Sequence, residues 1–361
     1  MGLTNTQTNS EHGEADSRRI SIDAFFAETV IFITGATGFL GKVLLEKLLR
    51  SCPRVATFFL LIRPKRGQSV EDRFKELLNN PVFDRIRSEF PDTMNKIFPV
   101  KGDVGLPDLG LQPADRDMLI QRVNIVFHSA ATVRFDEPLK VAVNLNTLGT
   151  DRMLDLCRRM TNLISIIHVS TAYSNADRRE IEESIYIWGE FGCLVRKHAI
   201  ESPSKYVMWY PGFTFRTNKF IHAIMVATLH YLPAFVVDLI LRVQGSKPIM
   251  LKITKRFERA AKTGQFFAMN EWKFHTGNMI ELIKIVNESK EKDQFDLDIK
   301  NMDWDVYLHQ YMLGIRKYIL KDNLDTLKHA RNKLSKLYWM QKFTKVLSTF
   351  ALLGIIKCVG R

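Results

Sequence analysis

The sequence predicts an α/β fold with a doubly wound parallel sheet, followed by a mainly helical C-terminal region. Two patterns lead to this prediction. In the first half, short apolar runs rich in β-branched and aromatic residues alternate with helical patterns, as in parallel sheets with right-handed crossovers. In the second half this alternation stops, and helical patterns rich in Lys and Arg follow one another. A chain of 361 residues is long enough for two domains, each with its own core.

Five apolar runs are expected to form the strands of the sheet. Strands that are buried on both faces read as continuous hydrophobic runs of this kind. The predicted strands are Thr29–Thr34, Thr57–Arg63, Ile97–Lys101, Val123–His128 and Leu163–Val169. Helical patterns lie between them, around Val70–Leu78 and Val141–Met160. We expect the sheet to stop after the fifth strand, which leaves an edge that has to be covered.

A glycine-rich segment, GATGFLG, connects the first predicted strand to the first helix. Gly35 permits a tight turn, Gly38 lets backbone N–H groups approach a ligand, and Gly41 lets the helix pack close to the strand. The positive end of the helix then faces the turn, so the segment is typical of pyrophosphate binding. A glycine-rich turn without a ligand is the alternative interpretation.

The first helix is expected to continue until Pro53 ends it. Its apolar side chains recur at helical spacing, which predicts one common face. The residues on that face are Phe39, Leu40, Val43, Leu44 and Leu48.

The loop after the second strand carries basic residues. A site for NAD usually places an acidic side chain here, where it binds the 2′-hydroxyl of the ribose. This chain has Arg63 and Lys65 instead. Because their charge suits a 2′-phosphate, the sequence favours NADPH as the cofactor. A solvated basic loop is the alternative.

The ends of the last three strands carry further candidate residues. Asp103 could accept a hydrogen bond from the amino group of adenine. The small residues Ser129–Ala131 would let a cofactor lie over the edge of the sheet. Ser170 and Thr171 offer hydroxyl groups that could hold a substrate carbonyl. All of them follow the carboxyl ends of strands, where open α/β sheets bind ligands.

Several segments resemble the alcohol-forming fatty acyl-CoA reductases, which are extended short-chain dehydrogenase/reductases, and in particular the insect enzymes. In the first half the resemblance rests on TGATGFLGKVLLEKLL, LLIRPKRGQS, KGDV, FHSAATVRFDEPL, NTLGT and HVSTAY. In the second half YPGFTFRTNKF, LPAFVVDLILRVQGSKPIMLKI and FDLDIKNMDWDVYLHQYMLGIRKYILKD are similar to the male-sterility-type C-terminal domain of that family. The resemblance covers about Thr29–Tyr186 and Tyr206–Asp322.

The resemblance implies a Rossmann-type domain over residues 28–186, a junction over residues 187–204 and a helical domain over residues 205–322. It also implies reduction of a long-chain acyl-CoA to a fatty alcohol by NADPH. The residues that would bind the pyrophosphate are Gly35, Thr37, Gly38, Phe39, Leu40 and Gly41. The other expected cofactor contacts are Arg63 and Lys65 at the 2′-phosphate, Asp103 and Val104 at the adenine, and Ser129, Ala130 and Ala131 at the ribose. Ser170 or Thr171 would be the catalytic hydroxyl, and we favour Thr171.

The Tyr-x-x-x-Lys pair that completes the site in this superfamily is missing from its expected place. There, the tyrosine gives a proton to the carbonyl oxygen, and the lysine lowers the pKa of the tyrosine. Only Tyr338 has a lysine at this spacing, Lys342, and both lie beyond the C-terminal domain as helical i, i+4 neighbours. The catalytic helix, the sixth strand and the substrate loops are therefore predicted to be absent, with the junction near Ile185–Gly189.

Two hypotheses follow from the missing segment. In the first, the chain is a fatty acyl-CoA reductase whose adenine and pyrophosphate contacts persist while hydride transfer falls drastically. In the alternative, it is a catalytically inactive paralogue or splice form that acts as an NADPH-binding or regulatory module.

Composition narrows the range of partners. The formal net charge of +13 favours an anionic partner such as an acidic lipid or a phosphorylated small molecule. No basic helix accompanies a nucleic-acid fold signature, so no nucleic acid is expected to bind. The four scattered cysteines argue against a disulfide framework or a zinc site and fit a reducing compartment, so no metal is predicted. Residues 1–27 are predicted to form a disordered polar tail.

Two apolar segments bear on membrane association. Phe220–Leu241 has the length of a membrane span, but two histidines, a proline and Asp238 interrupt it, so we expect a buried or interfacial helical hairpin. Val346–Ile356, in a basic tail over residues 323–361, is too short to span. Because the family resembled here works on the endoplasmic reticulum or peroxisomal membrane, an intracellular, membrane-associated location is expected. The sequence does not predict an oligomeric state.

Overall fold

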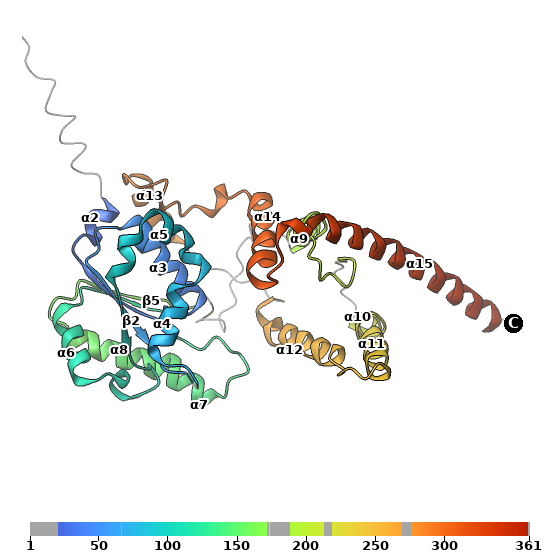
Figure 1. Cartoon of the computed structure of the whole chain (residues 1–361), viewed down its shortest axis with the longest axis horizontal. Helices are drawn as coiled ribbons and strands as arrows, with labels where there is room; N and C mark the ends of the chain where they lie inside the picture. Colours follow the sequence, from blue (N-terminus) through green and yellow to red (C-terminus); the bar gives the residue numbers. More distant parts are fainter. Residues whose placement is uncertain are drawn as a thin grey trace, which may run out of the picture. The chain divides into compact units, whose positions relative to one another are not determined.

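The computed structural model of the chain describes residues 21–65, 67–171, 173, 188–212, 219–268 and 276–359. The chain divides into two compact units. The first comprises Met1–Glu180 and Phe274–Leu297, and the second comprises Ile181–Lys273 and Asp298–Arg361. Figure 1 shows the chain coloured along its sequence, with many of its helices and strands labelled.

The first unit is built on a parallel sheet with the strand order β3-β2-β1-β4-β5. The strands are β1 (Val30–Thr34), β2 (Thr57–Ile62), β3 (Ile97–Lys101), β4 (Ile125–His128) and β5 (Ser165–His168). They confirm the predicted fold class, and each begins and ends within two residues of its predicted bounds. The strand order reverses at β1, so a topological switch point lies between β1 and β4.

Helices cover both faces of this sheet and form two cores. Ile31 and Ile33 of β1 belong to one core, and Phe32, which points to the opposite face, belongs to the other. The helices of this unit are α2 (Ile22–Phe26), α3 (Phe39–Ser51), α4 (Val70–Leu78), α5 (Asp84–Glu89), α6 (Pro113–Arg122), α7 (Leu139–Ala142), α8 (Leu148–Arg159) and α13 (Gly277–Asn287).

Helix α3 ends at Ser51, just before Pro53 as expected, but its buried face differs from the predicted one. The residues that it buries are Gly41, Leu45, Leu48, Leu49 and Ser51. Phe39 and Leu40 are 84% and 61% exposed. They lie in the first turn, which the glycine segment places at the carboxyl end of the sheet, and only the later turns pack on the strands. The helical spacing of apolar residues does not distinguish the exposed first turn from the buried later turns.

Strand β5 forms an open edge of the sheet. Within the described part of the chain it pairs with β4 alone. The residues of β1, β2 and β4 are buried throughout, whereas Ile164, Ile167 and Val169 in and beside β5 are exposed. A sheet that stops after its fifth strand has this appearance, and the cover expected for its edge is not seen among the described residues.

The first unit also includes parts of the chain that the sequence placed elsewhere. Helix α2 lies inside the predicted disordered tail, because the Ser21 side chain caps it and donates a hydrogen bond of 2.6 Å to Glu291. Phe295 packs against the core that contains α3, and the Lys47 ammonium lies 4.4 Å from the centre of its ring. Residues 274–297, assigned from the sequence to the C-terminal domain, therefore belong to the first unit.

The described part of the second unit is helical, as predicted. Its helices are α9 (Trp188–Glu201), α10 (Lys219–Val226), α11 (Leu232–Val243), α12 (Met250–Ala268), α14 (Trp304–Gly314) and α15 (Leu327–Val359). The predicted apolar segment Phe220–Leu241 falls on α10, the π-helical turn η6 (Ala227–Tyr231) and α11. Among the described residues, no helix combines the length and the apolar character that a membrane crossing requires.

Asp238, one of the residues that interrupt the apolar segment, caps the next helix. Its carboxylate accepts hydrogen bonds of 2.8 Å from the N–H groups of Ile249 and Met250, and one of 2.9 Å from Leu251. Burial alone would raise the pKa of Asp238, but these hydrogen bonds outweigh it and lower the pKa. The buried charge thus joins α11 to the start of α12.

A buried ion pair follows α14. Arg316 and Asp322 are almost fully buried, with 3.4 Å between the guanidinium and the carboxylate. Asp322 also accepts hydrogen bonds from the Thr326 hydroxyl at 2.5 Å, the Ser204 hydroxyl at 3.0 Å and the Lys205 N–H at 2.8 Å. Burial would raise the pKa of Asp322, but the hydrogen bonds and the charge of Arg316 outweigh burial and lower the pKa to about 2.

This pair makes the stability of the second unit depend on pH. A carboxyl group with a lowered pKa stabilises the fold above its unfolded-state pKa of about 3.9, and this contribution is lost as the pH falls towards 2. We expect Asp322→Asn to cost about 3–5 kcal/mol at pH 7, because it leaves Arg316 buried without its counter-ion, and to cost progressively less below pH 4. Urea unfolding followed by tryptophan fluorescence measures this, since all five tryptophans belong to the second unit.

The exposed Asp325 provides the control for this experiment. Asp325→Asn is expected to change the free energy of unfolding by less than about 0.5 kcal/mol at either pH. A destabilisation by Asp322→Asn that is equally large at pH 7 and pH 3 would contradict the assignment.

Candidate functional site

A cavity of about 590 Å³ lies at the carboxyl ends of the strands in the first unit. Its walls come from the turn after β1, the loops after β2 and β3, and the loop after β4. This is the switch point of the sheet, where doubly wound folds bind their ligands. The predicted residues that line it are Gly35, Thr37, Gly38, Arg63, Asp103, Val104, Ser129, Ala130 and Ala131.

The turn between β1 and α3 depends on its glycines. Gly35 has a φ of 76°, and a Cβ atom there would lie 2.7 Å from the backbone of Ser129. A Cβ atom on Gly41 would lie 2.3 Å from the carbonyl oxygen of Gly35. Gly38 is the N-cap of α3, and no side chain caps the helix. The N–H groups of the first turn therefore face the cavity at the positive end of the helix, an arrangement that attracts a phosphate.

Hydrogen bonds hold the loop after β4 against the end of β1. The Ser129 hydroxyl donates to the Thr34 carbonyl at 2.8 Å, and the Thr34 hydroxyl accepts the Ala130 N–H at 3.2 Å. The Thr34 hydroxyl also lies 2.8 Å from Nδ1 of His128. These contacts fix the small residues of the loop at the rim of the cavity.

His128 is a structural residue of the site that the sequence did not single out. It is fully buried, and its Nε2 lies 3.2 Å from the Thr150 hydroxyl, so it links β4 to α8. Burial, and to a lesser extent the neighbouring His168, lowers the pKa of His128 to about 4. The imidazole is thus neutral at physiological pH. The signal in the sequence that could have indicated His128 is its position, as a histidine at the end of an apolar run.

Three arginines line the cavity: Arg63 after β2, Arg73 on α4 and Arg134 in the loop after β4. Arg73, on α4, donates hydrogen bonds to the Thr37 hydroxyl at 3.1 Å and to the Arg63 carbonyl. The half-exposed Arg63 guanidinium lies 3.9 Å from the carboxylate of Asp103. The sequence predicted Arg63 but missed Arg73, because a single arginine in an amphipathic helix does not indicate a binding site.

Four predicted cofactor residues do not line the cavity. Lys65 forms an isolated bridge with Gln68 in the loop after β2. Phe39 and Leu40 are exposed, so their contribution to a phosphate site is limited to the backbone N–H groups. Gly41 is buried beneath the turn, where its role is close packing.

The two candidate catalytic hydroxyls also lie outside the cavity lining. Ser170 and Thr171 are exposed in the loop that follows β5. The Thr171 hydroxyl accepts the N–H of Tyr173 at 3.2 Å. Residues 185–187 of the predicted junction, Tyr186 among them, fall outside the described residues, and helix α9 occupies most of the predicted junction 187–204.

The one Tyr-x-x-x-Lys pair of the sequence has packing contacts in the second unit. The Lys342 ammonium lies 5.3 Å from the centre of the Tyr338 ring, and that ring lies 5.0 Å from the ring of Tyr210. These contacts fit the interpretation of Tyr338 and Lys342 as helical neighbours on α15.

Comparison with known proteins identifies the family. Two family models match, both described as male sterility protein: an NAD-binding model over residues 33–237 and a second model over residues 229–322. Fatty acyl-CoA reductase 1 of Gallus gallus and of Homo sapiens are each 27% identical over 463 residues, which cover 88% of this chain and 90% of the relative. The chain belongs to the fatty acyl-CoA reductase family.

The family match indicates which ligand the cavity binds. Every residue that lines it lies inside the NAD-binding match, so the first unit is the nicotinamide-cofactor domain of an oxidoreductase family. The uncapped helix terminus, the crowded glycines and the arginines of the cavity all fit such a cofactor. The aligned length of 463 also exceeds the 361 residues of this chain, so these fatty acyl-CoA reductases contain residues within the aligned range that have no counterpart here.

Solved reductase domains are also similar to part of the chain. The terminal reductase domain of the myxalamid biosynthetic pathway is 31% identical with a TM-score of 0.35, over 45% of this chain and 38% of that one. A reductase domain of a nonribosomal peptide synthetase from Mycobacterium tuberculosis is 27% identical with a TM-score of 0.33, over 45% and 39% of the two chains. The chain spans less than half the length of either structure.

Alanine substitutions at two glycines test whether the close approach of the Gly35 turn to the Ser129 loop, rather than backbone strain, determines the affinity for the cofactor. Gly35 and Gly67 both have positive φ, 76° and 81°, but a Cβ atom on Gly67 would meet nothing within 4 Å. Alanine at either position costs about 1–2 kcal/mol of strain. Gly35→Ala must also displace the Ser129 loop, so we expect its affinity for the nicotinamide cofactor to fall at least about tenfold while Gly67→Ala binds normally. Fluorescence titration measures both, and equal affinities would contradict this account.

Proposed function

We propose that this chain binds NADPH and is a fatty acyl-CoA reductase whose reduction of long-chain acyl-CoA is drastically slowed. The observation that carries the proposal is the combination in one cavity of an intact phosphate turn and the arginines Arg63 and Arg73, in a chain that lacks the Tyr-x-x-x-Lys pair at its expected place. Cofactor binding depends on the cavity residues, whereas catalysis depends on the missing segment, so cofactor binding persists without full catalysis.

The preference for NADPH over NADH rests on Arg63 and Arg73. Guanidinium groups pair with phosphate oxygens through parallel hydrogen bonds, and both side chains line the cavity, with Arg73 bonded to Thr37 of the phosphate turn. Asp103 lies beside them and supplies an acceptor for the amino group of adenine. An acidic residue that would bind a free 2′-hydroxyl does not follow β2 in the sequence.

The slow step is hydride transfer. The cavity residues would hold NADPH, which would supply one hydride in each of two reductions: thioester to aldehyde with release of CoA, and, with a second NADPH, aldehyde to alcohol. Ser170 or Thr171 can donate a hydrogen bond to the carbonyl oxygen, as both are exposed after β5. The absent pair removes the proton donor, which typically supplies a factor of about 10²–10⁴ in rate, and also a group that positions the nicotinamide.

A second candidate function is that of a binding module without turnover. The observation that favours it is the open edge at β5, next to the exposed candidate hydroxyls, where a complete site would hold the nicotinamide and the substrate. In that case the chain would hold NADPH, or a partner reductase, and yield no product.

We also propose that the second unit lies against an intracellular membrane, that of the endoplasmic reticulum or the peroxisome. Large apolar side chains are exposed along α10 and α11: Phe220, Ile224, Leu232, Phe235, Val236, Leu239 and Ile240. Exposed basic side chains follow on α12: Lys252, Lys255, Arg256, Arg259 and Lys262. An apolar helical pair beside a basic helix suits the interface of a bilayer with acidic lipids, where an acyl substrate also partitions.

Cofactor preference tests the role of the arginines. Arg63→Ala and Arg73→Ala are each expected to weaken NADPH binding by about 10- to 100-fold, because each removes a charge-assisted hydrogen bond, and to leave NADH binding nearly unchanged. Arg85→Ala, a surface arginine paired with Glu89 outside the cavity, is the matched control. Isothermal titration calorimetry with both cofactors measures the ratio. Equal losses for NADH and NADPH would exclude a 2′-phosphate site.

Product analysis tests the activity. The chain is expressed in cells that make no fatty alcohol, beside a full-length family reductase and an empty vector, and fatty alcohol is measured by mass spectrometry. We expect no fatty alcohol above the level of the empty vector. We also expect to find the chain in the membrane fraction. A normal yield of alcohol would mean that another residue, such as Tyr173, supplies the proton, and would overturn the proposal of slowed turnover. Recovery of the chain in the supernatant would overturn membrane association alone.

A further inference from the structure

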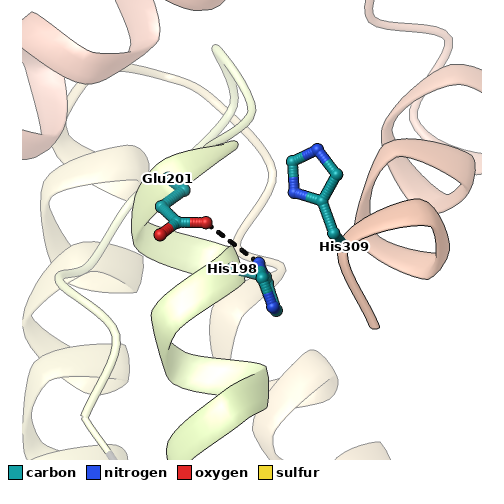
Figure 2. A group of neighbouring side chains, drawn as sticks. All are labelled: His198, Glu201 and His309. Carbon is teal, nitrogen blue, oxygen red and sulfur yellow. Dashed lines mark hydrogen bonds and ion pairs between the residues drawn. The ribbon is translucent and has the colours of Figure 1, made fainter. Parts of the chain in front are cut away.

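A buried histidine in the second unit lies between two carboxylates, and Figure 2 draws it with one of them, Glu201, and with His309. His198, on α9, is 2% exposed. Its Nδ1 lies 2.9 Å from the carboxylate of Glu201, one turn later on the same helix, and its Nε2 lies 3.0 Å from the carboxylate of Asp305 on α14. His309, also on α14, lies beside them, with the centre of its ring 5.3 Å from that of His198.

Each ring nitrogen of His198 faces a carboxylate oxygen. Asp305 also accepts hydrogen bonds of 2.7 and 2.9 Å from the Lys197 ammonium, so its carboxylate acts as an acceptor. An N–H at Nε2 of His198 serves this contact with Asp305. The other ring nitrogen, Nδ1, lies 2.9 Å from an oxygen of Glu201, and both of these atoms are groups that can bind a metal ion.

We propose that His198, Glu201 and His309 bind a zinc ion. One ligand atom from each lies within 4.8 Å of the others. Two imidazole nitrogens and one carboxylate form a donor set that suits Zn²⁺, with water in the fourth position. The side chain of Glu201 is 44% exposed, which gives the ion a path from solvent.

Asp305 acts as a positioning residue for this site. Histidines that bind metals usually donate their other ring N–H to a carboxylate, which fixes the tautomer and the direction of the ring. The Nε2–Asp305 hydrogen bond does this for His198, and Lys197 holds Asp305 in place. The bound ion requires a small adjustment, because donor atoms around tetrahedral zinc lie roughly 3.4 Å apart at bond lengths of about 2.0–2.2 Å. Side-chain rotation of the half-exposed Glu201 and of His309 provides it.

The ion would fasten α9 to α14. These two helices are far apart in the sequence, and α9 is the first described helix of the second unit. A structural role of this kind is independent of the reductase reaction, so the proposal stands whether or not the chain turns over. The cysteine pattern gave no sign of it, since no cysteine takes part.

Zinc binding to the full chain tests the proposal. The protein is purified with a tag that contains no histidine, stripped with EDTA and titrated with ZnCl₂ by calorimetry, and bound zinc is measured after dialysis by mass spectrometry. We expect one zinc per chain in the micromolar range or tighter, and a rise in Tm on zinc addition. His309→Asn and Glu201→Gln are expected to abolish both effects, and Asp305→Asn to weaken binding by about 10- to 100-fold. His329→Asn, an exposed histidine on α15, is the matched control and should bind normally.

Each outcome decides the question. Loss of zinc in His309→Asn and Glu201→Gln, with both variants retaining the Tm of the zinc-free parent, supports the site. Stoichiometric zinc that persists in both variants would place the ion elsewhere and overturn the proposal. Absence of zinc binding by the parent chain would also overturn it.

Discussion

The first unit depends on the close approach of the turn after β1 to the loop after β4. Gly35 lies so near Ser129 that one additional carbon atom does not fit, and the hydroxyl and carbonyl of Thr34 hold the same loop by hydrogen bonds. This contact sets the start of α3, and so the direction in which its free N–H groups point. It also brings the end of β4 beside the end of β1, which opens the cavity at the switch point of the sheet.

The elements that carry local signals were predictable from the sequence. Each buried strand is a continuous apolar run, Pro53 marks the end of α3, and the glycine segment sits between a strand and a helix, so the strands and the phosphate turn were predicted close to where they lie. The small residues after β4 were predictable as well, because the doubly wound strand order places the ends of β1 and β4 side by side.

Features that arise from packing were not predictable. Arg73 enters the cavity because α4 returns across the loop after β2, and the single residue carries no pattern. Glu291 and Phe295 join the first unit through contacts with a segment more than two hundred residues earlier, so their sequence neighbours suggested the other domain. His198 and His309 meet only because α9 packs on α14. The spacing of Phe39 and Leu40 is compatible with a buried helix face and with an exposed one. Both side chains are exposed because the first turn of α3 lies at the carboxyl end of the sheet.

The order of the cavity residues along the chain has a consequence for synthesis on the ribosome. Every residue that lines the cavity lies between Gly35 and Leu145, whereas Phe295, which packs beside α3, is made much later. Domains generally fold as units during synthesis. The first unit is therefore complete only after residue 297 has been made, when helices α9 to α12 of the second unit have already been synthesised. A cofactor that binds the folded first unit stabilises it only from that point on.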